Sequence, residues 1–357
     1  MLSTADPALE STILAAALHA TSMGLANAHR PGAILQTLQA SLLLAQYFFH
    51  GARLLEARYH AIAALSIVLG ADFHKIRSGA GSRHGGHGSP SEIAPAVTLL
   101  EEGERINAFW AVLTLNCCLF AVAHPMSGSS VDYGMVDVPW PLDIELYERD
   151  SRFLPLQSSR TIESFLANRA DQGRSVLALR AKAAVLFEQA SLLSSQATDH
   201  AQLSAKHIAL NAAIEMFKQT LGANQHPGLL IAHVLSHAST LLLHRPFVGS
   251  YDESRQSMLR AARVIVDITR SQNWTALGYI DPVFGTIWAL TLDFLGGEIS
   301  RLKYRGSPGS AQMLRQFNEA GQNVLSAMTT AASRCKMIEV QIESTMNQFL
   351  GATNAIA

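Results

Sequence analysis

One apolar stretch constrains the fold of this chain more than any other feature. It runs from Ala108 to Ala123, and only Thr114 and Asn116 within it are clearly polar. A helix that is apolar on nearly every side is a buried helix. At 1.5 Å per residue the stretch would span about 24 Å. A bilayer crossing needs roughly 20 apolar residues, or about 30 Å of helix, so the stretch is too short for one. We therefore predict the central helix of a protein core.

Charged residues precede this stretch and a proline follows it. The carboxylates of Glu101, Glu102 and Glu104 suit the positive end of a helix dipole. Pro125 ends the helix, and it disfavours helical backbone at His124. The residues that we predict at the centre of the core are Phe109, Trp110, Val112, Leu113, Leu115, Leu119 and Phe120.

The rest of the chain shows helical spacing of apolar residues. With 48% hydrophobic and 15% charged residues, the 357-residue chain can bury a large core. We predict one all-α domain over residues 1–357, built from packed antiparallel helices and helical hairpins. Further predicted helices are Pro7 to Gly24, Ile34 to His50, Leu54 to Leu69, Val176 to Leu193, Lys206 to Leu221, His226 to His244, one through Met258 and Ile268, one from Pro282, and a region from Gln312 to Leu350.

Glycine-rich sequence interrupts the helical pattern at residues 77–91, where we predict a flexible surface loop. His84 and His87 lie in it, and His74 lies just before it. Imidazole is a common ligand of transition metals. A metal site is nevertheless the less favoured interpretation, because ordering such a loop costs entropy and no cysteine or carboxylate cluster assists.

The second interruption, residues 124–160, is a long connector rich in proline and acidic residues. One interpretation is a solvated connector. The other is a lid or seam in which Tyr133, Trp140 and Tyr147 pack onto the helices while the carboxylates remain in water. We expect the tail at residues 351–357 to fray. The acidic residues of the connector are Asp132, Asp137, Asp143, Glu145, Glu148 and Asp150.

Histidines recur at steps of seven, four and seven residues, at His226, His233, His237 and His244. At about 100° per residue they project within roughly 40° of one another. His233 and His237 could chelate a metal, but Val234 stands where a zinc protease has glutamate, and no third ligand is in reach. Neutral histidines bonded to neighbouring helices are the favoured interpretation, and a ligand-facing wall is the alternative.

These observations define one candidate site. We expect an effector pocket between the helix from Glu104 to Ala123 and the histidine-bearing helix. If the histidines face such a pocket, replacing His233 and His237 by Ala should weaken effector binding more than folding. The candidate residues of an effector pocket, or of a structural polar face, are Trp110, His124, His233, His237 and His244.

The order of several motifs resembles the central regulatory (middle homology) region of fungal zinc-cluster (binuclear Zn-Cys) transcription factors. These motifs, from about residue 30 to residue 300, are Glu104-Arg105, Phe109-Trp110, the apolar helix, Asp137-x-Pro139-x-Pro141, Ala181 to Glu188, His226 to His233, Leu242 to Phe247 and Leu277 to Pro282. The resemblance implies a nuclear transcription regulator that senses an effector or contacts partner proteins, such as the transcription machinery or members of its own family.

The family's six-cysteine zinc cluster is absent from this sequence, as are the basic linker and dimerising heptads beside it. The resemblance therefore places zinc and direct DNA contact in a segment that this chain lacks, and we predict no cofactor or metal in the chain itself. The net charge of −1 also gives no basic field for nucleic acid. Cys117, Cys118 and Cys335 fit a reduced intracellular protein, and no secretion signal or membrane helix is predicted.

Two other functional classes remain. A stand-alone helical module that binds a ligand or partner without DNA contact shares every physical feature with the regulator. An all-helical enzyme is least favoured, because diphosphate chemistry needs clustered aspartates to hold magnesium. Asp132 with Asp137, or Asp252 with Glu253, do not form such a cluster, and no P-loop or Gly-x-Ser-x-Gly motif is present. We predict that the chain is not an enzyme.

Overall fold

The computed structural model describes residues 7–27, 32–79, 95–122, 131–149, 157–197, 204–222, 226–305 and 310–354. Thirteen α-helices fall within these ranges, and no strand does. They are α1 Pro7–Gly24, α2 Ala33–His50, α3 Leu54–Gly70, α4 Leu99–Val122, α5 Ile144–Arg149, α6 Thr161–Leu166, α7 Val176–Gln196, α8 Ala205–Leu221, α9 Leu230–His244, α10 Asp252–Ser271, α11 Val283–Arg305, α12 Ser310–Ala332 and α13 Lys336–Asn354. The all-α fold predicted from the sequence is confirmed.

Short 3₁₀ turns join several helices. They are Leu25–Asn27, Phe73–Lys75, Tyr133–Met135, Pro227–Leu229 and Arg245–Phe247. Within the described ranges, the only extended pairing is an isolated bridge between Ser78 and Ser158.

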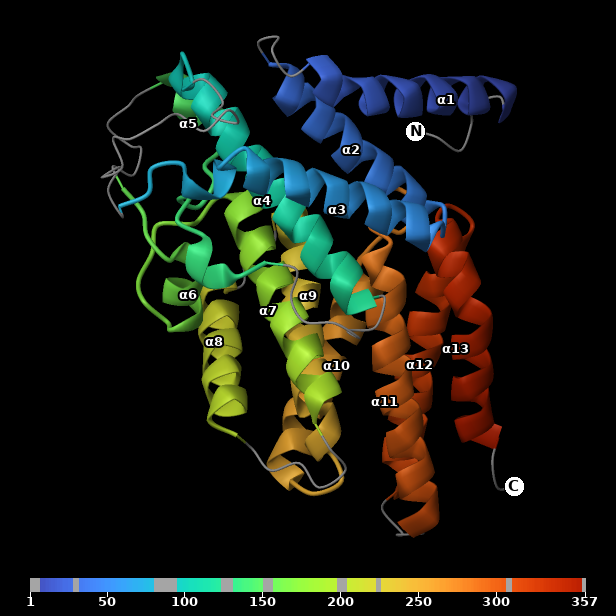
Figure 1. The fold of residues 1–357 in the computed structure, drawn as a ribbon. Coiled ribbons are helices and arrows are strands. Elements are labelled where there is room, and N and C mark those ends of the chain that lie inside the picture. Colours follow the sequence, from blue (N-terminus) through green and yellow to red (C-terminus); the bar gives the residue numbers. More distant parts are fainter. Residues whose placement is uncertain are drawn as a thin grey trace.

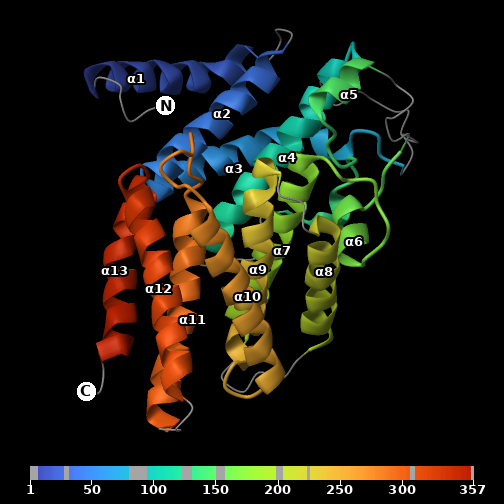
Figure 2. The ribbon, with the colours of Figure 1, turned by 180° about the vertical axis from the view of Figure 1, so that it is seen from behind.

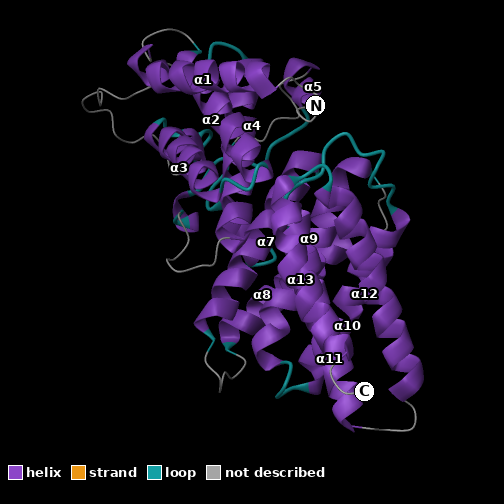
Figure 3. Ribbon diagram, turned by 90° about the vertical axis from the view of Figure 1, so that its right-hand side faces the viewer, coloured by secondary structure: helices purple, strands orange, loops and turns teal. Residues whose placement is uncertain are grey.

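The helices form two groups (Figure 1). Helices α1 to α5 lie across one end of the molecule, and the long helices α7 to α13 extend away from them side by side, as the view in Figure 3 also shows. Seen from behind, α9 and α10 lie in front of α7 (Figure 2). Helix α7 packs against α4 on one side and against α8 and α9 on the other. It therefore joins the two groups.

The predicted central helix is present as α4, which is longer than its apolar stretch. It begins at Leu99 and ends at Val122, before Pro125. Six of the seven predicted core residues in it are buried, and Phe120 is half-buried. The buried Asn116 amide donates to Ala61 O at 3.0 Å and to Val112 O at 2.9 Å. A polar residue is tolerated here because its donors are satisfied.

Helix α4 is also long and apolar enough to cross a membrane, judged by length and composition alone. In this fold 67% of its most apolar window is buried against other helices. The central helix of a water-soluble core has the same character, so this property is weak evidence for a span.

The C-terminal region differs from the single helical region predicted from Gln312 to Leu350. It is divided into α12 and α13 at residues 333–335, where the amides of Arg334 and Cys335 both bond Ala331 O at 3.0 Å. The two helices approach closely at Gly321, where an added Cβ would lie 2.0 Å from Phe349 Cζ. Helix α13 also continues past Gly351 to Asn354, and residues 355–357 of the predicted frayed tail lie outside the described ranges.

Candidate functional site

The described part of the connector packs against the helices instead of extending into solvent. Tyr133, Trp140 and Tyr147 are 9%, 6% and 4% exposed. This is the packed seam of the second interpretation. Most of the described connector carboxylates remain exposed, and Asp137 is half-buried; the exposed ones are Asp132, Asp143, Glu145 and Glu148. Residues 124–130 and 150–156 of the connector, His124 and Asp150 included, lie outside the described ranges, as do residues 80–91 of the glycine-rich loop.

Trp110 of α4 holds the connector in place. Its Nε1 donates to Pro139 O at 2.7 Å, and its ring stacks on Trp140 with centroids 4.3 Å apart and an interplanar angle of 25°. The side chain has no exposed surface. Trp110 was a candidate for an effector pocket shared with the histidines, but the structure directs it toward the connector.

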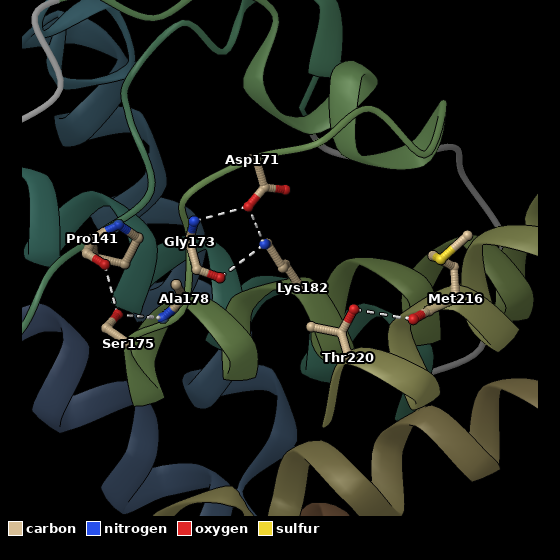
Figure 4. Close-up of polar contacts among 8 residues, drawn as sticks. All are labelled: Pro141, Asp171, Gly173, Ser175, Ala178, Lys182, Met216 and Thr220. Atoms are coloured by element: carbon tan, nitrogen blue, oxygen red, sulfur yellow. Dashed lines mark hydrogen bonds and ion pairs between the residues drawn. The ribbon is translucent and has the colours of Figure 1, made fainter. Parts of the chain in front are cut away.

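A buried ammonium group lies beneath Trp140. Lys182 of α7, 3% exposed, donates from Nζ to Asp171 Oδ1 at 2.5 Å and to Gly173 O at 2.9 Å (Figure 4). The same nitrogen lies 4.8 Å from the Trp140 ring centroid and 5.3 Å from that of Phe165. Burial lowers the pKa of Lys182, and the hydrogen bond that Lys182 donates to Asp171 opposes that effect. The cation thus ties the segment before α7 to the aromatic cluster.

Two neighbours of Lys182 show why the backbone takes this path. A Cβ on Gly173 would lie 2.5 Å from Trp140 Cγ, so only glycine admits the ring. The hydroxyl of Ser175 donates to Pro141 O at 2.6 Å and accepts from Ala178 N at 3.1 Å (Figure 4). This N-cap begins α7 and bonds it to the connector at Pro141.

A second polar contact between α7 and the connector is fully buried. Glu188, 1% exposed, accepts a hydrogen bond from the Tyr133 hydroxyl through Oε2. Cys117 Sγ lies 3.5 Å from the same oxygen. Burial raises the pKa of both Cys117 and Cys118 well above the ordinary value. These thiols are therefore protonated at neutral pH and are poor nucleophiles.

Only three of the four histidines lie on α9. Pro227 begins a 3₁₀ turn, and α9 starts at Leu230, so the exposed His226 precedes the helix and its Nδ1 accepts from Gly228 N at 3.1 Å. His244 is buried, with Nε2 3.1 Å from Asn211 Oδ1 and Nδ1 3.1 Å from Ser254 Oγ. Burial lowers its pKa. Its partners belong to α8 and α10, which is the structural arrangement favoured from the sequence.

His237 has a more unusual environment. Burial lowers its pKa to about 3, with the charge of Lys218 acting in the same direction. Its Nδ1 is buried and has no hydrogen-bond partner among the described residues. Lys218 of α8 donates to Thr240 Oγ1 at 2.6 Å and to Glu215 Oε1 at 2.8 Å, and burial lowers its pKa as well. His237 is therefore a neutral side chain beside a largely buried cation.

The effector pocket expected between α4 and the histidine-bearing helix stays a prediction. Helix α7 packs against both α4 and α9 and lies between them. A cavity of about 300 Å³ lies between α2, α4, α5 and the first turn of α7. Glu104 is the one charged side chain that lines it, and it makes no ion pair or hydrogen bond within the described residues. The apolar lining is Leu38, Leu42, Ala108, Ala111, Ile144 and Leu177.

Metal ligands do not converge in the described part of the chain. No group of three or more histidine, cysteine, aspartate or glutamate side chains there is placed to hold an ion. His84 and His87 lie outside the described ranges, and His74 is buried at 4% exposure.

Lys182, Asp171, Gly173 and Ser175 are not among the site residues predicted from the sequence. The available signal was Lys182 itself, which with Arg180 interrupts the otherwise apolar stretch from Ala178 to Phe187, because a buried ammonium requires partners. Comparisons of the chain with protein-family models, curated proteins and solved structures found no match.

Proposed function

We propose that this chain is a non-catalytic regulatory module of a nuclear transcription regulator similar to the fungal zinc-cluster factors. It would respond to an effector or a partner protein, and a segment outside this chain would supply zinc binding and DNA contact. The alternative is a stand-alone helical binding module without DNA contact, and the net charge of −1 fits both classes.

One observation carries the proposal: the segments that bear the resemblance make specific contacts with one another. Trp110 bonds the connector at Pro139, and Lys182 of α7 lies against Trp140. Arg180 of α7 lies 3.8 Å from Asp281, in the segment that precedes α11. Helix α9 packs on α7 as well. These contacts join the segments that carry the resemblance into one structural unit, and this supports the proposal.

The cavity beside α4 is the candidate binding site for an effector. The cavity of about 300 Å³ lies at the lower end of the range typical of ligand sites. Its lining is apolar except at Glu104, Asn107 and Gln39. This arrangement suits a small apolar molecule with one positive or hydrogen-bond-donating group.

A reporter assay tests the regulatory function. The full chain is fused to an unrelated DNA-binding domain and compared with that domain alone and with the same domain fused to an unrelated helical protein. We expect the fusion to shift reporter output up or down relative to both controls. Output equal to that of both controls, with the fusion folded by circular dichroism and present in the nucleus, would exclude a regulatory role and leave the stand-alone module.

A further inference from the structure

A long groove lies between α10 and α12, over α11. Its volume is about 680 Å³, and its α10 wall extends from Arg255 to Arg270. At 1.5 Å per residue this wall is about 22 Å long, the length of a helix of about fifteen residues. Figures 1 and 2 show α10, α11 and α12 running beside one another on the side of the molecule away from α8.

The floor of this α10–α12 groove is apolar. Val266 of α10 and Leu295 of α11 are buried at its base. Leu259 and Phe317 are half-buried on either side, and Met313 at one end of the α12 wall is 42% exposed. A continuous apolar surface of this kind, rimmed by polar residues, is typical of a protein-binding site.

Positive charge lines one wall of the groove. Arg260, Arg263 and Arg270 are exposed on α10 at steps of three and seven residues, so their guanidinium groups follow one face of the helix. Arg255 is not available to a partner, because it is held by Glu298 through three contacts of 2.7–2.9 Å.

The cations of this wall are weakly engaged within the chain. Arg270 lies 3.5 Å from Asp267 with both side chains more than half exposed, an ion pair that contributes little. Arg260 donates to the Ser257 hydroxyl at 3.0 Å, and Arg263 makes no ion pair or hydrogen bond with the described residues. Two guanidinium groups therefore face solvent without a carboxylate partner.

The α12 wall differs in charge. It presents Gln316, Ala320 and Asn323, with Glu319 as its one ionised group. The groove is thus basic along α10 and nearly neutral along α12. A ligand with carboxylates on one side and apolar groups beneath would fit in one orientation only.

We propose that the α10–α12 groove binds an acidic amphipathic helix of a partner protein. Apolar residues at steps of three and four would contact Leu259, Val266 and Phe317, which is the helix-in-groove mode of recognition. Aspartate or glutamate residues on one flank would pair with Arg260 and Arg263, whose planar groups bind carboxylates through two parallel hydrogen bonds. A nucleic acid suits the groove less well, because phosphates gain nothing from its apolar floor.

This proposal deepens the regulatory function above by naming the partner's chemistry, but its test measures binding alone. The probe is a fluorescein-labelled helical peptide of sixteen residues, with leucine or phenylalanine at steps of three and four and glutamate on one flank, titrated with the full chain by fluorescence anisotropy. We expect saturable binding that weakens with added salt. A peptide with glutamine in place of each glutamate should bind about tenfold more weakly.

Variants locate the binding site. The pair Arg260→Glu and Arg263→Glu should weaken binding of the acidic peptide at least about tenfold. Ala320→Trp, which places a large side chain from the α12 wall into the groove, should weaken the binding of both peptides. Arg315→Glu is the matched control, because Arg315 is an exposed arginine on α12 outside the groove, and it should leave affinity unchanged. Circular dichroism verifies that each variant is folded.

Three outcomes would overturn the proposal. The first is no binding of the acidic peptide to the folded wild-type chain. The second is equal binding by the wild-type chain and by the Arg260→Glu, Arg263→Glu pair. The third is a short DNA duplex that displaces the peptide and loses affinity with the same pair, which would make the wall a phosphate-binding surface. If peptide binding fails while the reporter fusion remains active, the groove is rejected and the regulatory function is not.

Discussion

Trp110 and Trp140 stack with their ring centroids 4.3 Å apart, yet only Trp110 makes a hydrogen bond through its indole nitrogen. The Nε1 atom of Trp140 is buried without a partner among the described residues. Comparing substitutions of the two tryptophans therefore isolates the contribution of one hydrogen bond to stability.

We predict that Trp110→Phe lowers the free energy of unfolding by about 1–2 kcal/mol more than Trp140→Phe does, because it alone leaves a buried carbonyl, that of Pro139, without its donor. Urea denaturation of the two variants provides the measurement. Equal losses in the two variants would show that the indole bond to Pro139 adds nothing to stability.

The buried ammonium of Lys182 supports a second prediction. Lys182→Met keeps much of the side-chain volume but removes the ammonium donor from Gly173 O and from Asp171, which keeps only its bond from Gly173 N. We therefore expect a loss of about 2 kcal/mol in the free energy of unfolding. Lys75→Met is the control, since Lys75 pairs with Asp72 at 2.8 Å in an exposed position, and it should cost less than about 0.5 kcal/mol. A Lys182→Met variant as stable as the wild-type protein would mean that the apolar replacement compensates for the lost ion pair.

The pKa of His237 predicts how stability depends on pH. That pKa is about 3 in the folded protein, whereas it is near 6.5 in the unfolded chain, so between these values the unfolded state binds more protons. The stability that the neutral His237 contributes to the folded state is fully present above about pH 6.5, and it is lost as the pH falls toward 3. Between pH 7 and pH 5 we expect the protonation of His237 in the unfolded chain to lower the free energy of unfolding by about 1–2 kcal/mol.

His237→Leu should reduce this pH dependence, and urea denaturation at several pH values measures it. Other histidines have lowered pKa values and will contribute in the same direction: the half-buried His50 and the buried His60, His74, His207 and His244. The variant should therefore flatten the profile only in part. His19→Leu, at an exposed position on α1, serves as the control. A profile unchanged by His237→Leu would place the effect at the other histidines.

The cavity beside α4 gives a fourth prediction, which separates Glu104 from the histidines. A small apolar amine such as phenethylamine should perturb the amide resonances of α2 and α4 at millimolar concentration. Glu104→Gln and the cavity-filling Ala111→Leu should each weaken this perturbation, because they remove the charge or the space. Helix α7 separates α4 from α9. Replacing His233 and His237 by Ala should therefore lower the free energy of unfolding without changing the binding of the amine. The opposite pattern, loss of amine binding only in the histidine variant, would restore the pocket expected from the sequence.

Helices with strong apolar periodicity could be predicted closely from the sequence, and α2 and α3 match their predicted ranges within about one residue. The break between α12 and α13 could not, because no glycine or proline marks residues 333–335. His226 was assigned to the wrong element, since Pro227 suits both the first turn of an α-helix and a separate 3₁₀ turn.

The candidate site depended on contacts that are remote in sequence. Trp110 bonds a residue 29 positions away, and Lys182 bonds Asp171, 11 positions away and outside α7. Helical spacing says which face of a helix is polar or apolar, but not which neighbour covers that face. For this reason helical spacing alone could not place α7 between α4 and α9.

Helix α7 has almost no free face: from Ala178 to Ser191 only Arg180 and Gln189 are not buried. One end of it lines the cavity through Leu177, and its middle holds Tyr133 through Glu188. A close-packed helix cannot shift alone, because interiors are nearly incompressible. A ligand that displaced Leu177 would therefore shift α7 as a whole, and with it the connector, α8 and α9, which pack against it. Helix α7 would in this way couple the cavity to the helices on its far side.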